Sequence, residues 1–117
     1  MTRFRITILL ATVTGALAIA VPSNAAVTKL TGTVGPGFTI TLTQSGKKVS
    51  SLKAGKYTFA ISDKSSIHNF HLTGPGVNVK TSVAAIGQKS FFITLKKGTY
   101  KFICDPHPFM KGSFTVG

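Results

Sequence analysis

Seven consecutive residues near the C-terminus, Cys104 to Met110, gather the rare metal-binding side chains of this 117-residue chain. The segment holds the only cysteine, one of three histidines and, apart from Met1, the only methionine. Thiolate, imidazole and thioether are soft and borderline donors that copper binds well. A second histidine, His68, lies upstream and could complete the set. Two imidazoles and a thiolate in a plane, with a distant thioether, suit a copper ion that cycles between two oxidation states.

Each donor taken alone has an ordinary structural explanation. A single buried cysteine or methionine is usually core packing, and a single histidine in a strand is usually structural. Zinc is a competing metal, but it favours closed sets of Cys and His. A Cys–His nucleophile is the enzymatic alternative. It lacks an obvious orienting acid, since the only carboxylates are Asp63 and Asp105.

The elements that must position these donors are short strands. No stretch shows a helical period, and runs rich in Val, Ile, Thr, Phe and Tyr alternate with turn residues, which is typical of an all-β chain. This spacing predicts a Greek-key β-sandwich of seven or eight strands. The predicted strands are Val27–Val34, Phe38–Thr43, Lys56–Ser62, Ile67–Thr73, Val79–Val83, Ser90–Leu95, Thr99–Cys104 and Ser113–Val116.

Strand periodicity indicates which histidine faces the interior. Cys104 ends the core-facing row of its predicted strand, and His68 shares a face with Phe70 near the start of its own. His71 lies on the opposite face and is expected at the surface. If the two strands run antiparallel, His68 and Cys104 reach the same end of the sandwich, and the following loop can present His107.

Two eight-residue segments resemble each other. Leu52–Phe59 and Leu95–Phe102 carry Leu, Lys, Gly, Tyr and Phe at matching positions. The match is too short and isolated to indicate a repeat protein. It predicts two similar turns, each of which places a tyrosine and a phenylalanine in or near the core.

Residues 1–25 are predicted to be a secretion signal. Arg3 and Arg5 precede an uncharged apolar run, and small residues lead up to a cleavage point after Ala25. Cleavage leaves one domain, residues 26–117, in the periplasm or the extracellular medium, with no stable membrane insertion. A retained anchor is the alternative, although the apolar run is short for a membrane span.

The lone cysteine excludes a disulfide within the chain. An odd cysteine in an exported protein indicates a free thiol, a bridge to another chain or a metal ligand. A domain of this size often needs a covalent or metal cross-link to stabilise its small core. A bound metal would meet that need.

The charge of the domain is strongly positive. Residues 26–117 carry twelve lysines, no arginine and two carboxylates, a formal charge of +10. We expect no nucleic-acid binding, because such proteins use arginine and longer basic runs. The lysines could form a solvated surface that discourages strand pairing. They could equally steer the protein toward an acidic partner or an anionic envelope surface.

The His68-Asn69 pair and the Cys-x2-His-x2-Met loop resemble the blue copper proteins, or cupredoxins, of the plastocyanin/azurin class. The short Pro-His-Pro-Phe-Met run is most similar to the loop of amicyanins. The resemblance implies one type 1 copper per chain, with His68, Cys104, His107 and Met110 as its ligands. It also implies that Asn69 ties the two ligand segments together. Asp105 departs from the pattern, which has a neutral residue there, and an ionised carboxylate should lower the reduction potential.

The resemblance further implies a one-electron shuttle and not an enzyme. Its partners would be redox proteins, for which acidic docking surfaces are one possibility, and the protein is expected to be a monomer. His107 would be the electron port, surrounded by an apolar patch of Pro36, Phe38, Pro106, Pro108 and Phe109. The alternatives are a copper-binding or storage protein without a redox partner, and a structural β-sandwich without a metal.

Overall fold

The computed structural model describes residues 11–12, 14–16 and 27–117 of the chain. Most of the predicted secretion signal, residues 1–25, lies outside the described residues. Among those that are described, no helix is long and apolar enough to cross a membrane.

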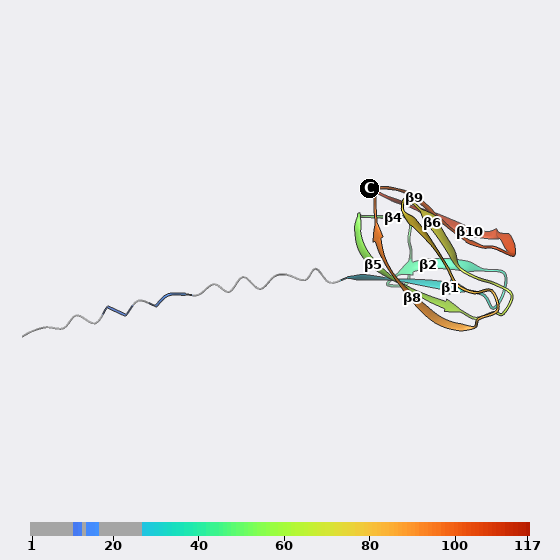
Figure 1. Ribbon diagram of the computed structural model, residues 1–117, viewed down its shortest axis with the longest axis horizontal. Helices are drawn as coiled ribbons and strands as arrows, with labels where there is room; N and C mark the ends of the chain where they lie inside the picture. Colours follow the sequence, from blue (N-terminus) through green and yellow to red (C-terminus); the bar gives the residue numbers. More distant parts are fainter. Residues whose placement is uncertain (1–10, 13, 17–26) are drawn as a thin grey trace, which may run out of the picture.

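Residues 27–117 form two mixed five-stranded sheets, which confirms the all-β sandwich (Figure 1). The first sheet has the order β3 (Lys47–Lys48), β2 (Ile40–Gln44), β1 (Thr28–Val34), β5 (Gly55–Asp63) and β8 (Gly87–Leu95). The second has the order β4 (Ser51–Leu52), β10 (His107–Val116), β9 (Gly98–Cys104), β6 (His71–Gly74) and β7 (Val77–Lys80). Two pairs, β1–β5 and β4–β10, are parallel, and the other pairs are antiparallel.

The core lies between the two sheets and follows the alternation of each strand. Every second residue of β5, beginning at Tyr57, is buried, and the pattern repeats in β9. Aromatic rings fill the interior: Phe70 stacks on Phe102, and Tyr100 stacks on Phe114. Among the described residues, the buried apolar side chains of this core lie between Leu30 and Val116, so we expect residues 27–117 to fold as an independent domain.

The two similar segments form two similar turns, as predicted. In each, a tyrosine hydroxyl donates a hydrogen bond to the carbonyl four residues earlier: Tyr57 to Lys53 at 2.7 Å and Tyr100 to Lys96 at 2.9 Å. Each turn contains a glycine with positive φ, 150° at Gly55 and 148° at Gly98. The four aromatic residues of the two segments are buried.

The strand directions give the sandwich two distinct ends. The Cys104 end comprises residues 35–38, 63–69 and 104–109. Here β1 and β5 finish in register, Val34 opposite Asp63, and β9 turns into β10. The Gly98 end comprises residues 53–56, 75–76 and 96–98, together with the start of β1 and Gly117. In Figure 1, β1 starts on the left and the β9–β10 turn lies on the right.

Over the described residues, the sandwich has ten strands and not seven or eight, because the short strands β3 and β4 were not predicted and lie outside every predicted range. Strands β2 and β8 begin two residues later and three residues earlier than predicted. Three other predicted strands differ in ways that affect the site or its neighbours. The segment Ile67–Phe70 is not a strand, because β6 begins at His71. The predicted strand Val79–Val83 is displaced to Val77–Lys80. The last strand begins at His107 and not at Ser113, because a bulge between His107 and Lys111 lets β10 pair with β9 on both sides of Pro108.

Candidate metal centre

Antiparallel pairing brings His68 to Cys104. Strand β6 pairs with β9 so that His71 lies opposite Ile103, which places the residues before β6 beside the end of β9. Cys104 is the last residue of β9, and it and His68 are both fully buried. The prediction that these two residues reach the same end is therefore confirmed, although His68 precedes its strand.

A hydrogen-bonded turn leads the chain from β5 to His68. The Asp63 carboxylate accepts a hydrogen bond from the Ser65 amide at 3.0 Å, and the Ser65 hydroxyl accepts one from the Ile67 amide at 3.3 Å. Burial raises the pKa of Asp63 above its usual 3.8, against the lowering effect of the Ser65 amide. On the other side, Gly35 has a φ of 67°, and a β-carbon there would lie 3.3 Å from the His68 ring. Glycine at this position thus leaves room for the imidazole.

A tight turn and a bulge carry the remaining donors. His107 pairs with Cys104 across the turn at Asp105 and Pro106, and the next pair on the ladder is Lys111 with Ile103. The bulge between these pairs contains Met110, whose side chain is buried, while Pro108 and Phe109 are exposed. The turn and the bulge, residues 104–111, therefore interrupt the regular β9–β10 pairing where His107 and Met110 lie.

Three donor atoms form a compact triangle. The Nδ1 atoms of His68 and His107 lie 3.0 Å apart, and the Cys104 sulfur lies 3.6 Å from each. A point equidistant from the three atoms is about 2.0 Å from each, close to the roughly 2.0–2.3 Å of nitrogen and thiolate bonds to a metal such as zinc. The three residues can therefore hold a metal ion without rearrangement.

The second nitrogen of His68 lacks the hydrogen-bond partner that the outer ring nitrogen of a metal-binding histidine usually has, within the part of the chain that the structure describes. A neutral imidazole that binds a metal through Nδ1 carries its proton on Nε2. The Nε2 atom of His68 is also buried. The ring is held instead by packing, with Phe38 edge-on at 5.2 Å between ring centroids.

Asn69 connects the two donor segments. Its side chain accepts a hydrogen bond from the Asp105 amide and donates one to the Asp105 carboxylate, both at 2.8 Å. It also donates to the Thr81 carbonyl at 3.3 Å. Asn69 is 1% exposed and the Asp105 side chain is 41% exposed, so these bonds link the interior to the surface. The residues next to His68 and Cys104 are thus fixed to each other.

His71 has a larger role than a surface histidine, which the sequence interpretation missed. Its ring bonds the Asp105 carboxylate at 2.8 Å and the Asn78 side chain at 2.7 Å. The Asp105 hydrogen bond raises the pKa of His71, against a smaller lowering by burial. Burial by itself would raise the pKa of Asp105, but the hydrogen bonds from His71 and Asn69 outweigh it and lower that pKa. The only sequence signal is the rarity of acids and histidines in a lysine-rich chain.

The carboxylates do not orient the donor histidines. Neither Asp63 nor Asp105 hydrogen-bonds His68 or His107 among the described residues. A groove of about 1030 Å³ lies between β2 and the β9–β10 pair and reaches the donor loop only at Pro108. The geometry does not resemble a nucleophile with an oriented base.

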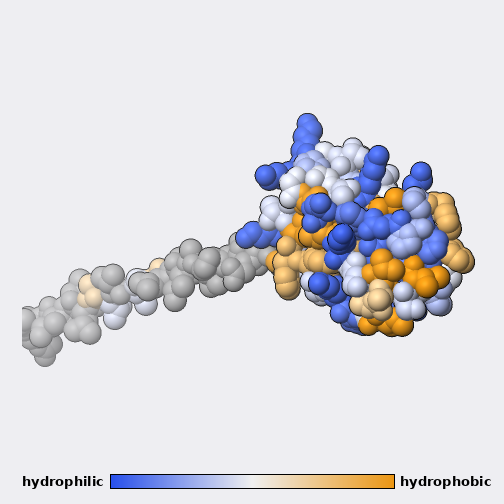
Figure 2. All heavy atoms as spheres, turned by 45° about the vertical axis from the view of Figure 1, so that its right-hand side comes forward, coloured by the Kyte–Doolittle hydropathy of each residue, from blue (hydrophilic) through white to orange (hydrophobic). Residues whose placement is uncertain are grey.

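Exposed aromatic side chains surround the partly exposed His107. Phe38 lies 5.1 Å from the His107 ring and 5.9 Å from the Phe109 ring, between centroids. Phe38 is 59% exposed and Phe109 is 67% exposed. Figure 2 turns this side forward and shows hydrophobic side chains gathered on it. The donors therefore lie beneath an apolar surface that His107 partly penetrates.

The fold and the donor set define a small copper-binding β-sandwich protein. The chain belongs to the plastocyanin/azurin family of copper-binding proteins, the cupredoxins, since the model of that family matches residues 20–117. Copper is accordingly the metal of this fold, and the donor set fits it.

Individual relatives agree with this assignment. Amicyanin-alpha of Methylorubrum extorquens is 37% identical over 68 residues, which cover 56% of this chain and 57% of the relative. The match therefore spans less than two thirds of that relative. The solved structure of the copper protein rusticyanin superposes with a TM-score of 0.56 at 18% identity, over 76% of each chain. Auracyanin of Roseiflexus castenholzii superposes with a TM-score of 0.55 at 20% identity, over 77% of this chain and 97% of auracyanin. At these identities the two structures support the fold.

Proposed function

We propose that the protein is a one-electron carrier and that His68, Cys104, His107 and Met110 bind one type 1 copper ion. The observation that carries the proposal is the triangle of two Nδ1 atoms and one thiolate sulfur, with sides of 3.0, 3.6 and 3.6 Å. Copper bound there supplies a one-electron couple. Met110, buried in the adjoining bulge, is the proposed weak fourth ligand.

A rigid frame around the donors favours electron transfer over storage. Asn69 fixes the His68 segment to Asp105, and the short turn fixes His107 to Cys104. Donors that keep their positions when the charge of the metal changes reduce the reorganisation that accompanies electron transfer. A storage protein has no comparable need for such fixed positions.

His107 is the proposed route for the electron. His68 and Cys104 are fully buried, whereas His107 is partly exposed between Phe38 and Phe109. A redox partner that covers this apolar surface would approach the metal through His107. Exposed aromatic side chains are favourable contacts at such interfaces.

We further propose that residues 1–25 direct export and are removed, so that residues 26–117 work in the periplasm or outside the cell as a monomer. The support is the charged start, the apolar run and the small residues before Ala25. The mass of the exported protein tests this point. A mature chain that begins at Ala26 is expected, and a full-length chain retained in the membrane would contradict it.

The experiment that tests electron transfer is redox cycling of the copper-loaded domain, residues 26–117. We expect one electron per chain, full reversibility, and rapid self-exchange, visible as broadening of NMR lines in mixtures of the two oxidation states. A matched control is Lys97→Gln, an exposed change at the Gly98 end, which should leave the exchange unchanged. Tight copper binding with slow exchange would instead assign the protein to storage.

A further inference from the structure

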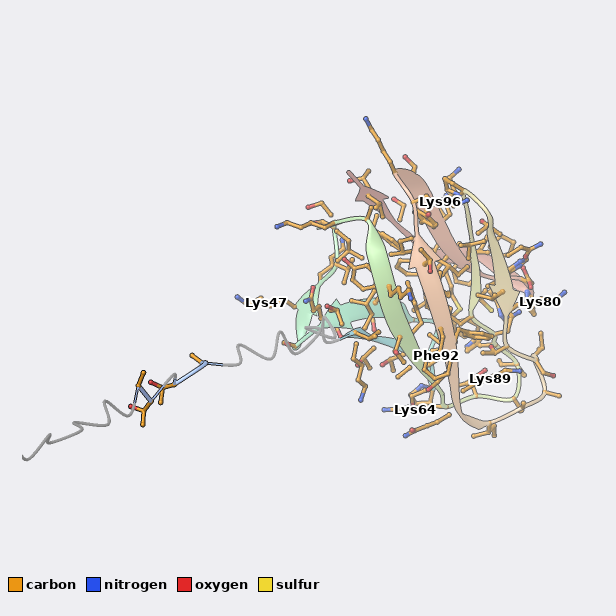
Figure 3. All side chains as sticks on the ribbon, turned by 60° about the vertical axis from the view of Figure 1, so that its left-hand side comes forward. Lys47, Lys64, Lys80, Lys89, Phe92 and Lys96 are labelled. Carbon is orange, nitrogen blue, oxygen red and sulfur yellow. The ribbon has the colours of Figure 1, made fainter. Side chains whose placement is uncertain are left out.

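Five of the twelve lysines gather at the Gly98 end, which the proposed electron transfer does not use. The β5–β8 register places Lys53 and Lys56 at the start of β5 beside the end of β8, where Lys96 and Lys97 follow. Lys29 is the second residue of β1. All five are exposed. Figure 3 shows Lys96 beyond one end of β8, with Lys64 and Lys89 near the other.

The carboxylates lie elsewhere. Asp63 ends β5 and Asp105 follows β9, so both lie at the Cys104 end, where they partly offset the charges of Lys64, Lys80, Lys89 and Lys111. Gly117 lies at the Gly98 end, and a chain that terminates there adds one carboxylate. Five lysines still leave this end strongly positive.

The lysines project from a fixed frame. The hydroxyls of Tyr57 and Tyr100 bond the carbonyls of Lys53 and Lys96, which secures both turns through the backbone. A third turn packs against them, because a β-carbon at Gly98 would meet Pro75 at 2.6 Å. The ammonium groups therefore extend from one rigid end and can contact a flat surface together.

The composition of this end favours lipid headgroups over a protein partner. Protein interfaces are rich in aromatic residues and arginine and poor in lysine. The domain has no arginine, and its exposed aromatic side chains, Phe38, Phe92 and Phe109, lie at the Cys104 end or on the face of β8. Mobile, hydrated ammonium groups bind anionic lipids as point charges, each adding to the attraction.

We propose that the Gly98 end is a docking surface for an anionic lipid bilayer. Bound in this way, the protein directs the Cys104 end away from the membrane, because the two ends lie at opposite tips of the strands. The inference does not depend on the copper, so it and the proposed electron transfer can fail separately.

The test measures binding of residues 26–117 to neutral phosphatidylcholine vesicles and to vesicles that contain phosphatidylglycerol. One variant replaces Lys53, Lys96 and Lys97 with Gln, and the matched control replaces Lys64, Lys80 and Lys89 with Gln. Both variants lose three positive charges at exposed positions. We expect binding to the anionic vesicles alone, about tenfold or more weaker for the first variant and within about threefold of wild type for the control. Added salt should abolish it, since screening acts over about 8 Å at 0.15 M.

Three results would overturn the proposal. One is no difference between neutral and anionic vesicles. Another is an equal loss in both variants, which would indicate attraction by net charge without a docking surface. The third is that the domain binds soluble polyglutamate more strongly than vesicles and that this binding depends on Lys53, Lys96 and Lys97. That result would assign the surface to an acidic protein. The far-UV circular dichroism and the urea unfolding of both apo variants should match wild type, which confirms that they are folded without reference to copper.

Discussion

The two ends of the sandwich are built from the same strands but have opposite chemistry. The Cys104 end holds both carboxylates, a partly buried network of polar side chains and exposed aromatic rings around His107. The Gly98 end holds five exposed lysines on turns fixed by tyrosine hydroxyls. The difference shows that one fold keeps its metal-binding donors and exposed aromatic rings at one end and a group of lysines at the other. The predictions below test how independent the two ends are.

The largest effect is expected from Cys104→Ser. Loss of the thiolate should remove the intense visible absorption of the copper protein and weaken Cu(II) binding by more than about a hundredfold, beyond the usual effect of residues that only support ligands. Absorption spectra and a copper titration measure both quantities. Lys97→Gln, at the other end, should change neither. An intense band that survives in the serine variant would mean that Cys104 is not a ligand.

Asn69→Ala should destabilise the apo domain by about 2–3 kcal/mol. The substitution leaves the Asp105 amide and the carbonyl of the buried Thr81 without their partner. Urea unfolding of apo protein measures the change. Asn78→Ala is the matched control, because Asn78 is exposed and bonds only His71, and it should lower the stability by less than about 1 kcal/mol. Equal losses would show that Asn69 does not hold the donor segments together.

Replacing both Phe38 and Phe109 with alanine should slow electron self-exchange about tenfold, because the two rings form the apolar surface around His107. The visible spectrum and the unfolding free energy should change little, since both rings are largely exposed. Phe92→Ala removes an aromatic ring that is 83% exposed on β8 and provides the control. If Phe92→Ala slows exchange as much, the patch around His107 has no special role.

The smallest effect concerns the His71–Asp105 pair. The pKa of His71 is raised above 6.5 and that of Asp105 is lowered below 3.8, so the pair stabilises the fold most fully between these two pH values. This contribution is lost when the pH is raised through the pKa of His71. It is also lost when the pH is lowered through the pKa of Asp105. It should amount to about 0.5 kcal/mol, because Asp105 is 41% exposed.

Urea unfolding of apo wild type and His71→Gln at pH 5.5 and 8.0 measures this contribution. The variant should lose less stability between the two pH values than wild type does. The same comparison in an Asp105→Asn background controls for other titrating groups. In that background, His71→Gln should no longer change the difference in stability between pH 5.5 and 8.0. An unchanged pH dependence in His71→Gln would exclude the pair as its source.

Alternation along β9 is a local rule and predicts that Cys104 faces the interior. Its meeting with His68 also requires that β6 and β9, which are far apart in the sequence, pair antiparallel. The burial of the donor thiol follows from the same alternation. The segment before β6 is harder to predict, because Ile67–Phe70 has the residue types of a strand but pairs with no neighbour. Its path is set by Asp63, Ser65 and the space at Gly35.

Contacts between distant polar side chains are the part that sequence reasoning could not reach. Asp105 looks like an anomaly beside the cysteine until the fold places Asn69 and His71 around it, 36 and 34 residues away. The grouping of the lysines at the Gly98 end was also not predictable from the sequence. Lys53 and Lys96 occupy matching turns in the sequence, but only the β5–β8 register shows that both turns lie at one end.

The visible and EPR spectrum of the copper-loaded domain, residues 26–117, tests the central claim most directly. We predict one copper per chain, an intense thiolate-to-copper charge-transfer band and reversible bleaching by a reductant. A Cu(II) protein without that band would contradict the assignment of Cys104, His68 and His107 as ligands of a type 1 centre.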